Sequence, residues 1–347
     1  MPRVLQAMAG ARHGGAEAFF TRLAPALHRA GLDQEVVIRR DRARADTLRD
    51  AGLRPHELAF GGPLDLLTPL RLRMLASSYR PDLVLTWMNR ATTRMPAGPW
   101  QHVARLGGYY DLRYYRRCDH LVGNTPDIVR HIVAGGWPVD RAHYIPNFVD
   151  SRPGAAVARP TLATPPGAPV LVALGRLHPN KAFDTLIHAL ALVPEAVLWL
   201  AGDGPERQRL EDLAVATGTA ARVRFLGWRN DTADIIAAAD LLVSPSRHEP
   251  LGNVILEGWA QRRPVVATQS AGARHLLDDG HTGLLCPVDD APALAGAIRT
   301  VLGDADLASR LAAAGAAACH ASFSERAVVD AWLDLFRRIT AERSCAP

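Results

Sequence analysis

The sequence predicts an α/β protein in which two doubly wound domains face one another across a cleft. Short apolar segments alternate with amphipathic helical segments along the chain, and glycine or proline bounds the apolar segments. Such alternation is typical of parallel sheets covered by helices on both faces. The length of 347 residues suits two hydrophobic cores. A proline-rich stretch without periodicity, residues 151–169, divides the pattern into two halves.

Residues 1–150 are interpreted as the first domain and residues 151–169 as the linker. A helix is expected from about Glu17 to Ala30, and another begins at Pro126, because Asn124 and Thr125 are residue types that cap a helix start. The strands predicted in this half are Val4–Met8, Gln34–Ile38, Asp82–Thr86 and His120–Gly123.

Residues 170–323 are interpreted as the second domain. Its predicted strands are Val170–Leu174, Ala196–Ala201, Val223–Leu226, Leu241–Ser244 and Pro264–Ala267. Helices are expected to begin near Ala182, Pro205, Thr232 and Gly252. Residues 324–347 should form a C-terminal helix that packs back toward the first domain, with an apolar side made of Val328, Trp332, Leu335, Phe336 and Ile339.

The charge distribution, the cysteines and the lack of long apolar runs bear on the cellular compartment in which the protein is expected. Residues 1–150 hold 21 Arg against 14 acidic residues, a net charge of +7, whereas the remainder holds 19 basic and 21 acidic residues, a net charge of −2. The four cysteines show no paired spacing, which favours reduced thiols and no metal site. No apolar run is long enough to span a bilayer, and the N-terminus does not resemble a signal peptide. We therefore expect a cytoplasmic protein.

The strongest functional motif is Glu249-Pro250-Leu251-Gly252-Asn253 followed by Glu257. Proline keeps Glu249 in a loop after a strand, and Gly252 lets the backbone approach a ligand. The N–H groups of Leu251, Gly252 and Asn253 open the next helix, where a diphosphate fits. Glu257 lies among apolar residues and needs hydrogen-bond partners, for which ribose hydroxyls are suitable. Taken singly, Glu249 could be a surface residue and Glu257 the partner of an arginine; together they favour a binding site.

Arg176 and Lys181 frame the loop after the first strand of the second domain. Lys181 is the only lysine, against 39 arginines. A guanidinium and an ammonium at a strand end can clamp a diphosphate leaving group. The alternative is a loop with solvated charges.

Three weaker motifs also follow strands. Gly14 and Gly15 can bring the backbone close to phosphate or sugar, or can form a tight turn. Gly202-Asp203-Gly204 reads as a turn, because it lacks the full dinucleotide fingerprint. Trp228 and Arg229 could border a nucleotide base or form an ordinary strand-to-helix turn.

In this order, the motifs resemble those of glycosyltransferase family 4, whose members have the GT-B fold of two Rossmann-like domains. The matching pieces are His13-Gly14-Gly15-Ala16-Glu17, Gly175-Arg176-Leu177 with Lys181, Ala201–Gly204, the Glu249–Glu257 pair and Asp279–Leu285. The resemblance implies that Arg176 and Lys181 contact the donor diphosphate and stabilise the leaving group. It also implies that Glu257 holds the ribose and Glu249 the donor sugar, while Gly14 and Gly15 close over the phosphates. Family members retain anomeric configuration and need no metal or other cofactor.

The chain departs from the family pattern in one place. Many members carry a histidine near the reacting carbon after a strand of the first domain, and Gly107 stands about there. His13, His102 and His120 are not assigned a catalytic role, since a lone histidine is more often structural.

The basic first domain suits a negatively charged partner such as a membrane surface or a phosphorylated acceptor, but solvated arginine-rich faces explain the charge alone slightly better. Arginines alternate with tyrosines between Arg105 and Arg117, and residues 64–79, with Arg71 and Arg73, could form an interfacial helix. Solvated charge and packing explain each stretch equally well. Aromatic residues beside basic ones also occur in proteins that bind single-stranded nucleic acid, but the sugar-nucleotide motifs already explain the cleft, so no nucleic-acid partner is expected.

The sequence thus predicts a retaining, metal-independent hexosyl- or heptosyltransferase. It would move a sugar from a nucleotide-sugar donor to a cell-envelope acceptor such as lipopolysaccharide core or another glycolipid, at the inner face of the cytoplasmic membrane. Two alternatives remain open: a nucleotide-sugar 2-epimerase on the same fold, and a non-catalytic glycan-binding protein. The first would consume donor without acceptor, whereas the second would lose the charged residues of the donor site.

Overall fold

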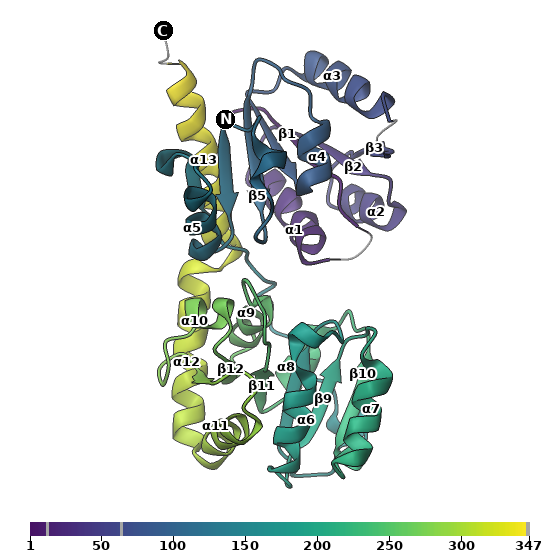
Figure 1. Ribbon diagram of the computed structural model, residues 1–347, viewed down its shortest axis with the longest axis vertical. Helices are drawn as coiled ribbons and strands as arrows, with labels where there is room; N and C mark the ends of the chain where they lie inside the picture. Colours follow the sequence, from purple (N-terminus) through teal and green to yellow (C-terminus); the bar gives the residue numbers. More distant parts are fainter. Residues whose placement is uncertain (12–13, 63–64, 345–347) are drawn as a thin grey trace. The chain divides into compact units, whose positions relative to one another are not determined.

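The chain forms two compact units, which are described separately. The computed structural model describes residues 1–11, 14–62 and 65–344. Unit 1 comprises residues 1–147 together with the chain from Glu325 onward, and unit 2 comprises residues 148–324 (Figure 1). The proline-rich stretch 151–169, which we expected to be a linker, belongs to unit 2, where Gly154 N–H donates to Gln261 Oε1 at 2.8 Å.

Unit 1 is built on a parallel seven-stranded sheet in the order β3-β2-β1-β4-β5-β6-β7. The strands are β1 (Val4–Met8), β2 (Gln34–Arg39), β3 (His56–Leu58), β4 (Leu83–Trp87), β5 (Gln101–Leu106), β6 (His120–Gly123) and β7 (Ala142–Tyr144). The helices are α1 (Gly15–Arg29), α2 (Arg42–Asp50), α3 (Leu67–Tyr79), α4 (Met88–Arg94), α5 (Pro126–Ala134) and α13 (Glu325–Ser344). Short 3₁₀ turns cover Leu112–Tyr115 and Val139–Arg141.

Unit 2 repeats this topology with six parallel strands in the order β10-β9-β8-β11-β12-β13. The strands are β8 (Val170–Leu174), β9 (Val197–Ala201), β10 (Val223–Gly227), β11 (Leu241–Ser244), β12 (Val265–Thr268) and β13 (Leu284–Cys286). The helices are α6 (Phe183–Ala191), α7 (Arg207–Ala216), α8 (Thr232–Ala238), α9 (Asn253–Ala260), α10 (Ala271–Leu276), α11 (Ala291–Gly303) and α12 (Ala305–Ser322). Short 3₁₀ turns cover Arg159–Leu162, Pro179–Lys181 and Ala220–Arg222.

The predicted fold class and strands are confirmed, with boundaries that shift by one residue at most. In both sheets the strand order reverses between the first strand and the strand placed fourth, β1 and β4 in unit 1 and β8 and β11 in unit 2. Ligands of doubly wound sheets bind at the carboxyl edge of such a reversal. The fold therefore directs attention to the loops after β8 and β11.

The sheet of unit 2 is covered on both faces, and β9 shows why: its five residues are all apolar and all buried. In β9, Leu198 and Leu200 pack into one core cluster, whereas Val197, Trp199 and Ala201 pack into the other. Successive side chains of a strand point to opposite faces, so a continuous apolar run is what two cores require.

The C-terminal helix α13, yellow in Figure 1, belongs to unit 1. Its five predicted apolar residues are all buried, none more than 3% exposed. Trp332 lies 6.5 Å from Trp87, measured between ring centroids, and 5.5 Å from Phe336. Two residues after Phe336, Arg338 Nη2 lies 3.3 Å from Nδ1 of His143 on β7. Across the described residues, no helix has both the length and the apolar composition needed to cross a bilayer.

Burial governs the ionisation of His102, which lies inside unit 1 on β5. Its Nε2 lies 3.0 Å from the hydroxyl of Thr86, and its backbone N–H donates to Asp119 at 2.7 Å. Desolvation lowers the pKa of His102 to about 4, although Asp119 opposes the shift. The ring is therefore neutral at pH 7 and acts as a core residue.

We predict that unit 1 loses stability as the pH falls from 7 toward 5. The folded-state pKa lies below the unfolded value of about 6.5, so the unfolded chain binds more protons across that interval. The free energy of unfolding should fall by about 2 kcal/mol between pH 7 and pH 5 from this group. Urea titrations at both pH values measure the change. H102Q cannot titrate and should show a smaller pH dependence; an equal dependence in both proteins would contradict the assignment.

Candidate functional site

The loops after β8 and β9 lie against one another at the carboxyl edge of the second sheet. The N–H of Gly175 donates to Ala201 O and the N–H of Leu177 donates to Asp203 O, both at 3.0 Å. Side chains at Gly202 or Gly204 would overlap the backbone of the β8 loop. The motif Gly202-Asp203-Gly204 is thus a turn that supports the loop carrying Arg176 and Lys181, as its sequence predicts.

The loop after β11 is attached to the same support. The backbone N–H groups of Arg247 and His248 both donate to Asn180 O, at 2.9 and 3.2 Å. Thr268 on β12 fixes the start of this loop, because its hydroxyl donates to Ser246 O at 2.7 Å. The two loops that flank the reversal of strand order are therefore joined through Asn180.

This attachment brings together Lys181 and Glu249, which are 68 residues apart in the sequence. Lys181 Nζ forms an ion pair with Glu249 Oε2, and the two side chains are 22% and 18% exposed. Gly175 lets the lysine lie along the loop: its φ is +142°, and a Cβ at this position would lie 3.2 Å from Lys181 Cε. Arg176, from the same loop, is exposed. The predicted site residues Lys181 and Glu249 thus contact each other, and Arg176 lies on the same loop as Lys181.

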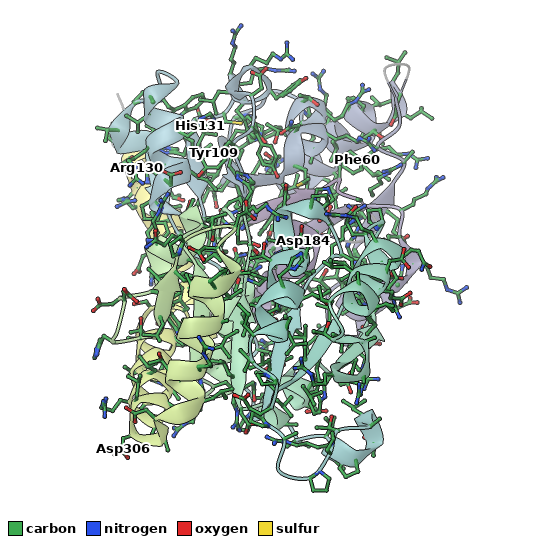
Figure 2. All side chains as sticks on the ribbon, turned by 60° about the horizontal axis from the view of Figure 1, so that its bottom comes forward. Phe60, Tyr109, Arg130, His131, Asp184 and Asp306 are labelled. Carbon is green, nitrogen blue, oxygen red and sulfur yellow. The ribbon has the colours of Figure 1, made fainter. Side chains whose placement is uncertain are left out.

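Arg247 holds the β11 loop in place, a role that the sequence did not reveal. Its Nη1 lies 3.0 Å from Oδ1 of Asp184, and its Nη2 lies 3.0 Å from Oδ2. Asp184 is labelled in Figure 2, at the start of α6. The Nε of Arg247 lies 2.5 Å from Asp289, and Nη1 also donates to Pro179 O at 2.9 Å. Burial opposes ionisation, but the hydrogen bonds from Arg247 hold the pKa of Asp184 below its ordinary value. The guanidinium connects the loops after β8, β11 and β13.

Helix α9 begins directly after the predicted motif. Gly252 is its N-cap residue, with φ 83° and ψ 47°, a left-handed conformation that glycine adopts without strain. No side chain caps this helix start. Leu251 is buried, and Asn253 is the first helical residue. Glu257 lies one turn further along, partly exposed. The start of α9 therefore lies at the same edge of the sheet as Lys181 and Glu249, and a helix N-terminus suits an anion.

Trp228 and Arg229 follow β10, at the far edge of the same sheet. Trp228 is 66% exposed, and its Nε1–H donates to Asn230 at 3.2 Å. Arg229 forms a two-point ion pair with Asp231, at 2.8 and 2.6 Å. The structure thus places both at the carboxyl edge, two strands from β8, with the guanidinium engaged by a neighbouring carboxylate.

Gly14 and Gly15 belong to unit 1, at the start of α1. A side chain at Gly10 or Gly14 would overlap the buried carboxylate of Glu17, which accepts from the N–H of Ala11 at 2.7 Å. Gly15 has open space where a Cβ would lie. Two glycines of this loop therefore make room for Glu17, while Gly15 leaves the helix start open. His13 lies outside the described residues.

Four described histidines of the first domain, His102, His120, His131 and His143, pack against other side chains. His102 is the core residue described above. His120 Nδ1 lies 3.0 Å from His143 Nε2, and the two rings stack. His131 packs edge-on against Tyr109 with ring centroids 5.5 Å apart (Figure 2). Burial lowers the pKa of His120 as well. None of these rings shows the arrangement of a catalytic acid or base.

Known proteins identify the family of this chain. The family model described as "Glycosyl transferases group 1" matches residues 168–304, and the one described as "Glycosyltransferase Family 4" matches residues 13–152. The chain is 40% identical over 328 residues to the lipopolysaccharide core biosynthesis glycosyltransferase LpsE of Rhizobium meliloti, covering 93% of this chain and 96% of the relative. It belongs to glycosyltransferase family 4. It is therefore a glycosyltransferase, as the sequence predicts.

Two further comparisons support this assignment. The lipopolysaccharide core biosynthesis glycosyltransferase LpsD of the same organism is 38% identical over 334 residues, with 95% and 97% of the two chains covered. The crystal structure of HepE from Anabaena in complex with UDP and glucose is 22% identical, with a TM-score of 0.82 and 97% and 100% of the chains covered. WaaG, a glycosyltransferase involved in lipopolysaccharide biosynthesis, gives a TM-score of 0.73 at 18% identity, with 96% and 99% covered. These likenesses show the GT-B fold.

We predict that Arg247 positions the loop after β11, which carries Glu249 and leads into α9. R247A should lower kcat/KM by about 10²-fold, because releasing the loop misplaces Glu249 and the start of α9. R247K, which keeps the charge but loses the two-point contact, should recover part of the rate. Initial rates with saturating and limiting donor measure the effect.

The matched control for this variant is R209A. Arg209 also contacts Asp184, at 3.4 Å, but it lies on α7 and is 60% exposed. R209A should keep the wild-type rate. A wild-type rate for R247A, or an equal loss for R209A, would contradict a positioning role for Arg247.

Proposed function

We propose that this glycosyltransferase moves a hexose or heptose from a nucleotide-sugar donor to an acceptor of the lipopolysaccharide core, with retention of anomeric configuration. The full-length similarity to two core biosynthesis enzymes carries the choice of acceptor. The carboxyl edge of unit 2 carries the choice of donor, because it combines positive charge, a helix start and carboxylates that suit hydroxyl groups.

The proposed role of Lys181 is to stabilise the departing diphosphate. An ammonium has three N–H donors, so one contact with Glu249 leaves donors for a phosphate. Arg176 lies on the same loop, and the first turn of α9 adds backbone N–H groups. We propose that Gly14 and Gly15 approach the phosphates from unit 1, that Glu257 binds the ribose and that Trp228 and Arg229 border the base. The cationic side chains and the helix start would supply the charge stabilisation without a metal.

Glu249 is proposed as a sugar-binding residue. Its ion pair with Lys181 keeps the carboxylate oriented toward the loop that would hold the diphosphate. An ionised carboxylate accepts hydrogen bonds from hydroxyls and donates none. This chemistry suits recognition of a donor sugar.

We predict that K181A lowers kcat by about 10²–10³-fold, the cost of removing one donor from a developing oxyanion. K181R should retain more of the rate because it keeps the charge. The assay is transfer of radiolabelled sugar to core oligosaccharide from a strain that lacks this gene, after a thermal-shift screen of UDP-, GDP- and ADP-sugars has selected the donor. The same assay in EDTA should give an unchanged rate. A wild-type rate for K181A would contradict the proposed site.

Omitting the acceptor separates the remaining candidates. A transferase should leave the donor largely intact, whereas a 2-epimerase would convert it to an isomer detectable by NMR. A non-catalytic binding protein would bind nucleotide or glycan without turnover under either condition.

We also propose that unit 1 docks on an anionic membrane surface through α3. Four large apolar residues of this segment are exposed: Leu66 (79%), Leu67 (65%), Leu70 (54%) and Met74 (64%). Arg71 and Arg73 are exposed on the same helix, and the opposite side of the helix packs on the sheet through Leu72 and Ala76. An outward apolar face with flanking arginines suits insertion between anionic headgroups. A glycolipid acceptor would be reached at such a surface.

We predict that the triple variant L67S/L70S/M74S lowers binding to phosphatidylglycerol-containing vesicles by about 10-fold or more, because three apolar side chains no longer enter the bilayer. Sedimentation with vesicles of phosphatidylcholine, with and without one-quarter phosphatidylglycerol, measures the partition. V139S is the control, since Val139 is 76% exposed in the same unit but lies outside α3. Equal binding by the triple variant would contradict docking through this helix.

A further inference from the structure

Arg105 is a buried cation in unit 1 whose charge no carboxylate neutralises by direct contact. It lies near the carboxyl end of β5 and is 3% exposed. Among the described residues it forms no ion pair, and its Nε has no hydrogen-bond partner. Its Nη2 donates to Asn147 Oδ1 at 2.6 Å, and a rotated Asn124 amide would accept from the same nitrogen at 3.0 Å. Both of these partners are neutral.

Two aromatic rings hold the guanidinium in place. Its central carbon lies 5.3 Å from the ring centroids of both Phe19 on α1 and Trp87 at the end of β4. Burial lowers the pKa of Arg105 to about 10, and more distant Tyr110, Tyr115 and Glu17 oppose the shift. The group therefore stays charged at neutral pH. Contacts with aromatic faces and a neutral amide offset only part of the cost of burying that charge.

The remaining edge of the guanidinium lies beneath the loop that follows β5. A Cβ built on Gly107 would lie 2.5 Å from Nη1, and Gly107 itself is partly exposed. Gly107 does not have a positive φ, so its backbone does not demand glycine. What requires glycine here is the nearby guanidinium. Residue 107 thus places no side chain against Nη1, at the edge of the sheet where ligands of this topology bind.

We propose that Arg105 binds an anionic group of the acceptor glycan. This inference rests on the proposed function. The site offers a rigid guanidinium that lacks a counter-charge, and a carboxylate or phosphate is the group whose planar or trigonal oxygens match its N–H fork. The donor diphosphate already has Arg176 and Lys181 as its proposed cationic partners, and Gly14 and Gly15 would approach it with backbone only. We therefore assign the anion bound by Arg105 to the other substrate. Arg105 would select acidic or phosphorylated core sugars over neutral ones.

The test compares R105Q and R105M with the wild type on three acceptors. These are the core oligosaccharide from a strain lacking this gene, the same material with its phosphates removed by hydrofluoric acid, and the same material with its carboxylates reduced to alcohols. In the variants, the acceptor KM for the untreated oligosaccharide should rise about 10–100-fold, the range for losing a hydrogen bond to a charged group. The donor KM should change less than about twofold.

The modified acceptors identify the anion. Wild-type enzyme should lose affinity for whichever treated acceptor lacks the recognised group, and the variants should not distinguish it from the untreated one. Equal fold-changes on all three acceptors, or a rise in donor KM with none in acceptor KM, would overturn the proposal. If neither the wild type nor K181R transferred sugar to any of the three acceptors, the result would contradict the proposed function instead.

A second pair of variants leaves Arg105 itself in place. G107A puts a methyl group against Nη1 and should raise the acceptor KM. Its neighbour G108A is the matched control, because a Cβ there would meet the Tyr110 ring at 3.7 Å, an ordinary contact. Thermal unfolding separates binding from folding: removing a buried charge while keeping its shape, as in R105M, should not lower the melting temperature. A lowered melting temperature with an unchanged acceptor KM would make Arg105 a structural residue only.

Discussion

The close approach of backbone segments at the carboxyl edge of the second sheet is the constraint on which the donor site depends. The β8 loop rests on the β9 loop because Gly202 and Gly204 have no side chains. The β11 loop then hydrogen-bonds to Asn180 of the β8 loop. The Lys181–Glu249 ion pair is about one-fifth exposed at each partner. Desolvation offsets much of the Coulombic gain of a mostly buried pair, so this pair alone is a weak tether between the two loops. The backbone contacts therefore position the charges, and the ion pair follows from that arrangement.

Unit 1 treats its buried polar groups in two different ways. Burial lowers the pKa of His102, so the ring is neutral at pH 7, and it lies within hydrogen-bond distance of the Thr86 hydroxyl. Even with its pKa lowered to about 10, Arg105 remains charged at neutral pH. Both lie on β5, three residues apart. The histidine therefore satisfies the core at little cost, whereas the arginine keeps a charge that the core does not balance. The contrast favours a ligand-binding role for Arg105, at the carboxyl end of β5, and a packing role for His102, near the start of the strand.

The sequence predicted those parts of the fold that an unbroken apolar run encodes. Strands β1, β8 and β11 are buried along their whole length and are apolar apart from Gln6 and Ser244. Their limits, Val4–Met8, Val170–Leu174 and Leu241–Ser244, were therefore predicted exactly. Strand β5 was missed because glutamine, histidine and arginine interrupt its apolar pattern. The edge strands β3, β7 and β13 were missed because three residues are too few to show a period. Similar reasoning explains the site: a motif shows which residues follow a strand, but not that Arg247 reaches Asp184, 63 residues away.

The division of the chain has a consequence for folding. Unit 2 is a continuous segment, so all its strands are available once residue 324 has been made. Unit 1 is not a continuous segment, because α13, which follows unit 2 along the chain, belongs to it. The side chains of Trp332 and Phe336 are fully buried, and each contributes about 1.5–3 kcal/mol by leaving water. Until they arrive, Trp87, Phe19 and Phe20 lack the aromatic partners that complete their cluster. The order of synthesis thus favours completion of the donor-side sheet before the sheet that carries Arg105.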